Sequence, residues 1–261
     1  VIAFMVVAGT NFALFWYAVS GRPDRLFGNR EFRSYVLAMA VVGAGIAALL
    51  FTGAGLAQVP EAVQTIPGEF ERALRQGLFQ AISIVTTTGY ASMDFNTWSE
   101  SAQTVLLFAM FLGGSAGSAA GSIKIIRWYV VQRAVRRELF TAVHPEAVRP
   151  VRIGDTVVDE GTIRGITALV LAFLAVFAVS TVVLFAEGHL NPRLDLSGLE
   201  AASTAIATLG NVGPGVGVVG PMDSYLRFST PAKVYMVVLM WIGRLELLSV
   251  FVVLTPAFWR R

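Results

Sequence analysis

The chain has 261 residues, of which 55% are hydrophobic and 14% are charged. This composition is too apolar for the water-exposed surface of a soluble domain and favours an integral membrane protein. The absence of cysteine excludes disulfide frameworks and thiolate metal sites, and the meaning of the small net charge of +3 depends on where the charges lie.

Five apolar segments approach the roughly 20 residues that a helix needs to cross a bilayer. They cover residues 1–20, 35–57, 98–131, 163–187 and 231–258. The first has no basic region before it and no cleavage site after it, so it is interpreted as a helix, and the chain is expected to be the C-terminal part of a longer protein. Two shorter apolar stretches, 70–86 and 197–207, each run into a turn rich in Thr and Gly, and their length predicts re-entrant half-helices.

The distribution of Lys and Arg supports this assignment. If residues 21–34, residues 124–164 and the C-terminus share one side of the membrane, that side carries fourteen of the 20 basic residues. The other side carries five, and Arg244 lies within an apolar segment. Because cytoplasmic loops carry the basic excess, the C-terminus is predicted to be cytoplasmic. Both short stretches must then enter and leave on the outer face.

The two short stretches also form an internal repeat. Residues 77–89 align without a gap on residues 198–210, with Gly, Leu, Ala, Thr and Gly coinciding. Each copy lies between a spanning helix before it and another after it, and both of these units start from the cytoplasmic side. They are therefore parallel repeats about an axis along the membrane normal, unlike the inverted repeats of many secondary transporters. This symmetry favours a pore on that axis.

The turn that ends each stretch is suited to binding a cation. The predicted filter residues are Thr87, Thr88, Gly89 and Tyr90 in the first turn and Thr208, Leu209, Gly210 and Asn211 in the second. A dehydrated potassium ion needs oxygens in place of its hydration shell, and backbone carbonyls of Thr/Gly turns supply them in known channels. The negative end of each half-helix dipole has the correct sign for a cation. The alternative is an ordinary glycine cap at the end of a helix.

The segment 98–131 contains a run of small residues at its centre, namely Gly113, Gly114, Ser115, Gly117, Ser118 and Gly121. Such weak helix formers at membrane depth indicate a helix interrupted beside a cavity. The spacing of four between glycines is equally typical of tight helix packing.

Arg244 lies in the apolar segment 231–258, where an arginine costs roughly 2.5–3.5 kcal/mol. It either places a positive charge in the pore or pairs with a carboxylate on another helix. Glu246 is two positions away, so it does not share the face of Arg244.

Five ordered motifs resemble the Trk/Ktr/HKT superfamily of potassium transporters, and its TrkH type in particular. They are TTTGY at 86–90, GGSAGSAAGSIK at 113–124, HPEAVRPV at 144–151, ATLGNVGPG at 207–215 and IGRLELL at 242–248. The resemblance implies an all-α membrane protein with four helix, pore-loop, helix repeats around one pore, of which this chain supplies the last two. The expected units are 1–34 (the last helix of the preceding repeat and a loop), 35–137 (third repeat), 138–162 (cytoplasmic loop) and 163–261 (fourth repeat).

The same resemblance implies potassium uptake through a gated, channel-like pore in the bacterial inner membrane, with K+ as the transported ion held only at the filter residues. It makes the run of small residues a gating loop, and it favours Arg244 as a charge in the pore. Implied partners are a second copy of the chain in a homodimer and a cytosolic nucleotide-binding regulatory subunit of the TrkA type. The basic loop 132–162 is otherwise explained by the positive-inside signal or by contact with lipid headgroups. An enzyme, a covalent cofactor or a nucleic-acid partner is not expected. The alternatives are an ion-coupled secondary transporter of a small solute and a membrane scaffold.

Overall fold

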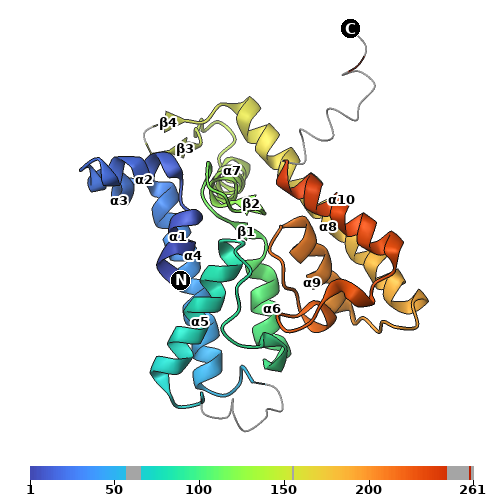
Figure 1. The fold of residues 1–261 in the computed structure, drawn as a ribbon. Helices are drawn as coiled ribbons and strands as arrows, with labels where there is room; N and C mark the ends of the chain where they lie inside the picture. The colour runs from blue at the N-terminus through green and yellow to red at the C-terminus, as the bar shows by residue number, and fades with distance from the viewer. Residues whose placement is uncertain (57–65, 155, 246–258, 260–261) are drawn as a thin grey trace.

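The computed structural model describes residues 1–56, 66–154, 156–245 and 259 (Figure 1). The helices in the described part are α1 (Ile2–Ala8), α2 (Phe12–Val19), α3 (Pro23–Gly28), α4 (Arg30–Phe51), α5 (Phe70–Val85), α6 (Glu100–Ala109), α7 (Ile125–Val143), α8 (Glu160–Leu190), α9 (Gly198–Leu209) and α10 (Thr230–Arg244). Strands β1 (Leu112–Gly113) and β2 (Ile123–Lys124) pair in parallel, and β3 (Arg152–Ile153) pairs antiparallel with β4 (Thr156–Val157). Three short 3-10 helices lie at Phe95–Thr97, Gly217–Val219 and Tyr225–Arg227. The fold is helical, as predicted.

Within the described residues, α4 and α8 are each long and apolar enough to cross a membrane. Helix α4 begins before the predicted segment because Asn29 caps its first turn by accepting a hydrogen bond from the backbone N–H of Phe32. Helix α8 likewise begins beside a capping side chain, Asp159, whose carboxylate accepts from the N–H of Thr162.

The segment 1–20, predicted as one helix, is divided into α1 and α2. The chain bends by 115° between α1 and α2, and the two together could form a single broken span. Asn11 caps the start of α2 by accepting from the N–H of Ala13. On the other side of the bend, the hydroxyl of the fully buried Tyr35 occupies the space where a side chain of Gly9 would lie. A residue of α4, outside the segment, therefore packs directly against the bend and requires glycine there.

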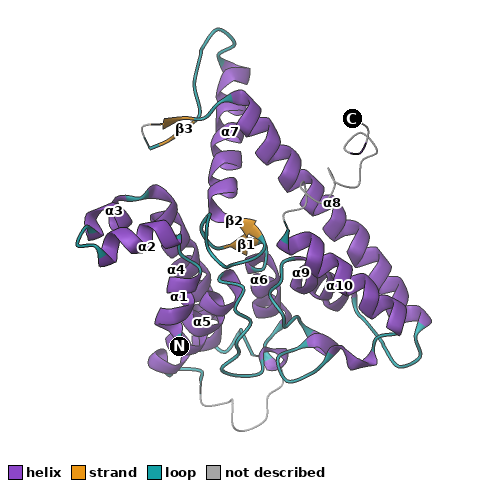
Figure 2. Cartoon of the chain, turned by 45° about the horizontal axis from the view of Figure 1, so that its top comes forward, coloured by secondary structure: helices purple, strands orange, loops and turns teal. Residues whose placement is uncertain are grey.

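The predicted spanning segment 98–131 is interrupted where the small residues occur. Helix α6 ends at Ala109, α7 starts at Ile125, and residues 110–124, here named the central loop, lie between them and include the β1–β2 pair. This break excludes the alternative of a continuous helix packed through its glycines. Figure 2 shows α7 rising from the central loop towards the β3 strand, and it packs against α8 and α4. For the segment 231–258, α10 accounts for the part up to Arg244, while residues 246–258 lie outside the described residues.

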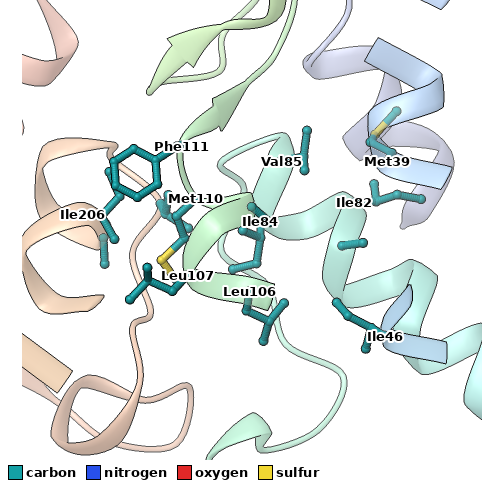
Figure 3. Packing of buried hydrophobic residues seen from close by; sticks show 14 of the residues in the cluster. Met39, Ile46, Ile82, Ile84, Val85, Leu106, Leu107, Met110, Phe111 and Ile206 are labelled. Atoms are coloured by element: carbon teal, nitrogen blue, oxygen red, sulfur yellow. The ribbon is translucent and has the colours of Figure 1, made fainter. Parts of the chain in front are cut away.

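Two groups of helices surround the short helices α5 and α9. Helix α5 packs chiefly on α4, and α9 packs on α8 and α10 (Figure 1). The α4–α5 contact is close because Gly77 leaves room for the backbone of α4, where its Cβ would lie 2.7 Å from the nitrogen of Ala47. One apolar core joins the two groups, and Figure 3 shows Met110 and Leu107 of the α6 region between Ile84 and Ile206. This core fixes α5 and α9 relative to each other.

Candidate functional site

Helices α5 and α9 end in two turns with the same hydrogen bonds. In the first turn, the N–H groups of Thr88 and Gly89 both donate to the carbonyl of Ser83, at 2.9 and 3.4 Å. In the second, the N–H groups of Val212 and Gly213 both donate to the carbonyl of Ala207, also at 2.9 and 3.4 Å. The turns that follow α5 and α9 are therefore held against their helix ends by the same pair of hydrogen bonds.

The backbone angles of the two turns match in the same register. Thr87 and Asn211 have φ values of +52° and +54°, and the glycines two residues later, Gly89 and Gly213, have +75° and +107°. Non-glycine residues with positive φ are uncommon, so a matched pair is a distinctive feature. The structural counterpart of Gly89 is therefore Gly213.

This register corrects the gapless alignment, which paired Gly89 with Gly210. Gly210 has a φ of −77° and caps α9, in the same way as Thr86 caps α5 with a φ of −80°. Thr208 and Leu209 belong to the last turn of α9, where the Thr208 hydroxyl donates to the carbonyl of Thr204 at 2.8 Å. The alignment matched residue types, whereas the hydrogen bonds to the helix end decide where the turn begins.

The two turns lie against each other. A Cβ on Gly89 would overlap the carbonyl oxygen of Val212 and would lie 2.9 Å from Pro214. Glycine is thus required at position 89 by both its positive φ and this contact. A Cβ on Gly213 would meet nothing within 4 Å, so its requirement for glycine comes from the backbone angle alone.

Most backbone carbonyls of the paired turns are without hydrogen bonds. In the described part of the chain, nothing donates to the carbonyls of Thr87, Thr88, Gly89, Asn211 and Val212. The series of unpaired carbonyls ends at Tyr90 in the first turn and at Gly213 in the second. The carbonyl of Tyr90 accepts from the Ser83 hydroxyl and that of Gly213 accepts from the Tyr225 hydroxyl, each at 2.6 Å. Desolvation raises the pKa of Tyr225, which keeps its hydroxyl protonated as the donor. A cavity of about 380 Å³ adjoins both turns and reaches Met236 of α10.

The central loop contacts the turns through Gly121. The Gly121 N–H donates to the Thr87 hydroxyl at 2.7 Å, and a Cβ on Gly121 would overlap the carbonyl oxygen of Gly210. A Cβ on Gly113 would in turn overlap the carbonyl of Gly121. These small residues allow the backbone of the loop to lie directly against the turns.

The middle of the central loop contacts the bend between α1 and α2. The Ser115 N–H donates to the carbonyl of Gly9 at 2.9 Å, and a Cβ on Gly114 would lie 2.6 Å from the same carbonyl oxygen. Gly117 has a φ of +72°. The hydroxyl oxygens of Ser115 and Ser118 are buried and have no hydrogen-bond partner among the described residues. The loop thus contains buried polar groups that its own protein environment leaves unpaired.

Arg244 ends the described part of α10 and reaches the central loop. Its Nη1 donates to the carbonyl of Ala119 at 2.7 Å. No carboxylate of the described residues forms an ion pair with it, and Glu246 lies outside them. A cavity of about 310 Å³ is bounded by the loop, by Gly243 and by Arg244. Arg244 thus acts on the loop backbone.

Sequence reasoning did not identify four residues of this site. Val212 and Gly213 belong to the second turn, and Lys124 donates through Nζ to the carbonyls of Ser118 and Ala120. Gly243 allows α10 to approach α9, because a Cβ there would overlap the carbonyl oxygen of Leu209. The pair Gly213-Pro214 was a visible signal for a turn.

Comparison with known proteins identifies the family. The family model "TrkH: Cation transport protein" matches residues 1–260. The chain is 32% identical over 265 residues to the Trk system potassium uptake protein TrkH of Vibrio parahaemolyticus, covering 99% of the chain and 50% of that protein. It is 29% identical to TrkH of Escherichia coli K12, covering 98% of the chain and 49% of the relative. It is 37% identical to TrkI of Halomonas elongata, covering 72% of the chain and 37% of the relative.

The fold is similar to the crystal structure of the potassium transporter TrkH from Vibrio parahaemolyticus, with a TM-score of 0.83 and 30% sequence identity. That match covers 99% of this chain and 52% of the other. The chain spans about half the length of the curated TrkH relatives it matches. The match of the family model over residues 1–260 shows that the chain belongs to the TrkH family of cation transport proteins, which are not enzymes.

Proposed function

We propose that the chain supplies part of a potassium-conducting pore, with its filter formed by the two paired turns. The filter comprises Thr87, Thr88, Gly89 and Tyr90 in one repeat, and Asn211, Val212 and Gly213 in the other. The observation that carries this proposal is the set of backbone carbonyls on two abutting turns that accept no hydrogen bond within the described part of the chain. Thr87, Thr88, Gly89 and Asn211 are half-buried and Val212 is buried, and most of these residues line the cavity beside the turns. A dehydrated cation in that cavity is a suitable partner for carbonyls that the protein leaves unpaired.

Potassium is chosen as the ion because the similar proteins are named as potassium uptake proteins. The helix ends give the site its sign, since α5 and α9 both direct their C-terminal, partially negative ends at the turns. The common turn geometry supports two pore repeats, 35–137 and 163–261, after a leading unit 1–34 and on either side of the loop 138–162. K+ is the transported ion, and no further cofactor is proposed.

The central loop is the gate in this proposal. It lies directly against the filter turns at Gly121, and Gly113, Gly114, Ser115, Gly117 and Ser118 belong to the same stretch. Arg244 adds a positive charge beside the loop and repels a cation approaching it. An ion can pass only when the loop and Arg244 move aside.

For the complete protein, we propose a homodimer in the bacterial inner membrane with the C-terminus in the cytoplasm. A cytosolic nucleotide-binding subunit of the TrkA type would regulate it, and membrane lipid would contact its basic loop. The charge distribution supports the orientation, because Arg133 and Arg136 in α7 and Arg149 in the connection from α7 to α8 lie on the side that carries the basic excess. The first part of the basic segment 132–162, predicted as a loop, is therefore helical, since α7 continues to Val143.

The test is potassium uptake by the full-length protein in potassium-starved cells. Gly89→Ser and Gly213→Ser should each lower the preference for K+ over Na+, because both residues need positive φ in the proposed filter. Surface expression is measured in parallel, with exposed Glu146→Gln as the matched control. Unchanged uptake and unchanged selectivity in both well-expressed glycine variants would show that the turns are not the filter.

A further inference from the structure

Glu31, in the first turn of α4, contacts the central loop across the protein. Its Oε1 accepts a hydrogen bond from the backbone N–H of Ala116 at 2.5 Å, although 85 residues separate the two in sequence. We infer that Glu31 is a positioning residue that holds the central loop in its pore-closing conformation. This inference rests on the proposed role of the loop as the gate.

The same face of α4 also contacts the bend between α1 and α2, against which the central loop lies. Tyr35, one turn after Glu31, donates its hydroxyl to the carbonyl of Val6 at 3.3 Å and fills the space beside Gly9. The carbonyls of Gly9 and Ala8 then accept from the N–H groups of Ser115 and Ala119, at 2.9 and 3.2 Å. The first two turns of α4 therefore fix the loop directly through Glu31 and indirectly through the bend between α1 and α2.

Three charged side chains bind the loop backbone, Glu31 from α4, Arg244 from α10 and Lys124 from the end of the loop itself, and the sign of each suits the group that it contacts. The carboxylate of Glu31 accepts from an N–H, whereas Lys124 and Arg244 donate to carbonyls of the loop. Charge-assisted hydrogen bonds of this kind are stronger than neutral ones. The loop consists largely of Gly, Ala and Ser, which offer little side-chain area for packing. These three contacts therefore make a large contribution to its conformation, and Glu31 makes the one that involves a backbone donor.

The position of Glu31 also gives the cytoplasmic side a route to the gate. Helix α4 begins at Arg30, directly after the short helix α3, which belongs to the segment proposed to be cytoplasmic. A displacement of that segment would move Glu31 relative to Ala116 without requiring contact with the loop itself. The carboxylate thus lies where a partner binding on this face could loosen the loop.

The test measures basal potassium flux through the full-length protein in liposomes without any partner protein. Glu31→Ala should raise the flux about tenfold, the shift in an open-to-closed ratio that results from losing one charge-assisted hydrogen bond. Glu31→Gln should raise it less, because the amide oxygen still accepts from Ala116. The selectivity for K+ over Na+ should not change, since Glu31 has no hydrogen bond to the filter turns. Glu146→Gln, an exposed carboxylate on the loop after α7, is the matched control with unchanged flux.

A second measurement reports the loop itself. The 261 residues contain no cysteine, so Ala116→Cys adds one thiol to this part of the protein and keeps the N–H that Glu31 accepts. Adding Glu31→Ala should make this thiol react about tenfold faster with a water-soluble maleimide, because the loop leaves its closed position more often. Adding Glu31→Gln should have a smaller effect, because its amide oxygen still accepts from the N–H of residue 116. If the Glu31 substitution only lowers the general stability, the melting temperature should fall. The reaction rate of the thiol at position 116, relative to that of an exposed control thiol, should then stay unchanged.

The outcomes separate this inference from the function on which it depends. If Arg244→Ala raises basal flux while both Glu31 variants leave flux and thiol reactivity unchanged, the loop is a gate and Glu31 does not hold it. If neither Arg244→Ala nor Glu31→Ala raises flux in folded protein, the proposed gate is itself wrong. Raised flux together with faster reaction of the thiol supports the inference.

Discussion

Replacing Gly213 with alanine tests the register of the two turns, because the corresponding change at Gly210 should behave differently. Gly213 has a φ of +107°, which an alanine adopts only with strain of about 1–3 kcal/mol. Its Cβ would meet no atom within 4 Å, so this strain is the whole effect on the local structure. The turn should relax by moving its carbonyls.

Gly210 differs because its φ of −77° is helical. Its structural counterpart in the first turn is Thr86, which carries a side chain at the same point. A Cβ on Gly210 would lie 2.8 Å from the carbonyl oxygen of Ile206, so the end of α9 must shift to accept it. Alanine at this position should therefore lower the stability through that contact, but it adds no strain from a positive φ.

The assay is the ratio of K+ to Na+ flux through purified full-length protein in liposomes. A strain of about 1.4 kcal/mol that is relieved by distorting the filter corresponds to about a tenfold change in relative binding, so Gly213→Ala should reduce the ratio by about that factor. Gly210→Ala should stay within about twofold of the unmodified protein, because it adds no strain from a positive φ.

The reverse result would refute this reasoning. If Gly210→Ala removes selectivity and Gly213→Ala keeps it, the gapless alignment gives the correct pairing and the shared hydrogen bonds do not identify the filter. If both variants retain full selectivity with normal flux, the second turn is not part of the filter.

Four further changes give separate tests. Arg244→Ala should raise basal conductance in planar bilayers because it frees the carbonyl of Ala119 from its hydrogen bond, and Arg244→Lys should keep the conductance close to that of the unmodified protein. Equal conductance in the unmodified protein and both variants would contradict a gating role. Gln80→Leu should raise the free energy of unfolding by about 1–2 kcal/mol, because the buried Gln80 amide has no hydrogen-bond partner among the described residues. A loss of stability would indicate that water forms hydrogen bonds with this amide. Ser197→Ala should lower the stability by about 1 kcal/mol in thermal unfolding in detergent, because it removes the capping box of α9, and an unchanged melting temperature would argue against that cap. Hydrogen bonds from Thr162 hold the pKa of Asp159 below its usual value. The stabilising effect of the Asp159 carboxylate is therefore present above the ordinary carboxyl pKa and is lost as the pH falls through the lowered pKa. Acidification should destabilise the unmodified protein more than Asp159→Asn, and parallel pH profiles of the two proteins would contradict this.

The sequence predicted which segments form helices, because hydropathy and length respond to the bilayer directly. The predicted stretch 70–86 became α5 (Phe70–Val85), and 197–207 became α9 (Gly198–Leu209). The predicted span 163–187 lies within α8 (Glu160–Leu190), which the capping side chain of Asp159 extends at its start. The position of the central loop was also predicted, because a run of Gly and Ser weakens a helix wherever it occurs.

The bend between α1 and α2 could not be predicted from its own segment. Residues 1–20 are apolar throughout their length, and hydropathy alone favours one spanning helix. At the bend, Tyr35, which lies 26 positions after Gly9, fills the space that a side chain at position 9 would need. A contact with another helix is absent from any local pattern.

The sequence by itself determined that this is a membrane protein with two copies of a short helix ending in a glycine turn, because apolar length, charge placement and glycine content are properties of the chain alone. The tertiary structure decided that Gly213, and not Gly210, corresponds to Gly89, and that Arg244 contacts the carbonyl of Ala119. The physical reason is that hydrogen bonds to a helix end and contacts between distant segments fix the turn and the loop, and the one-dimensional alignment contains neither.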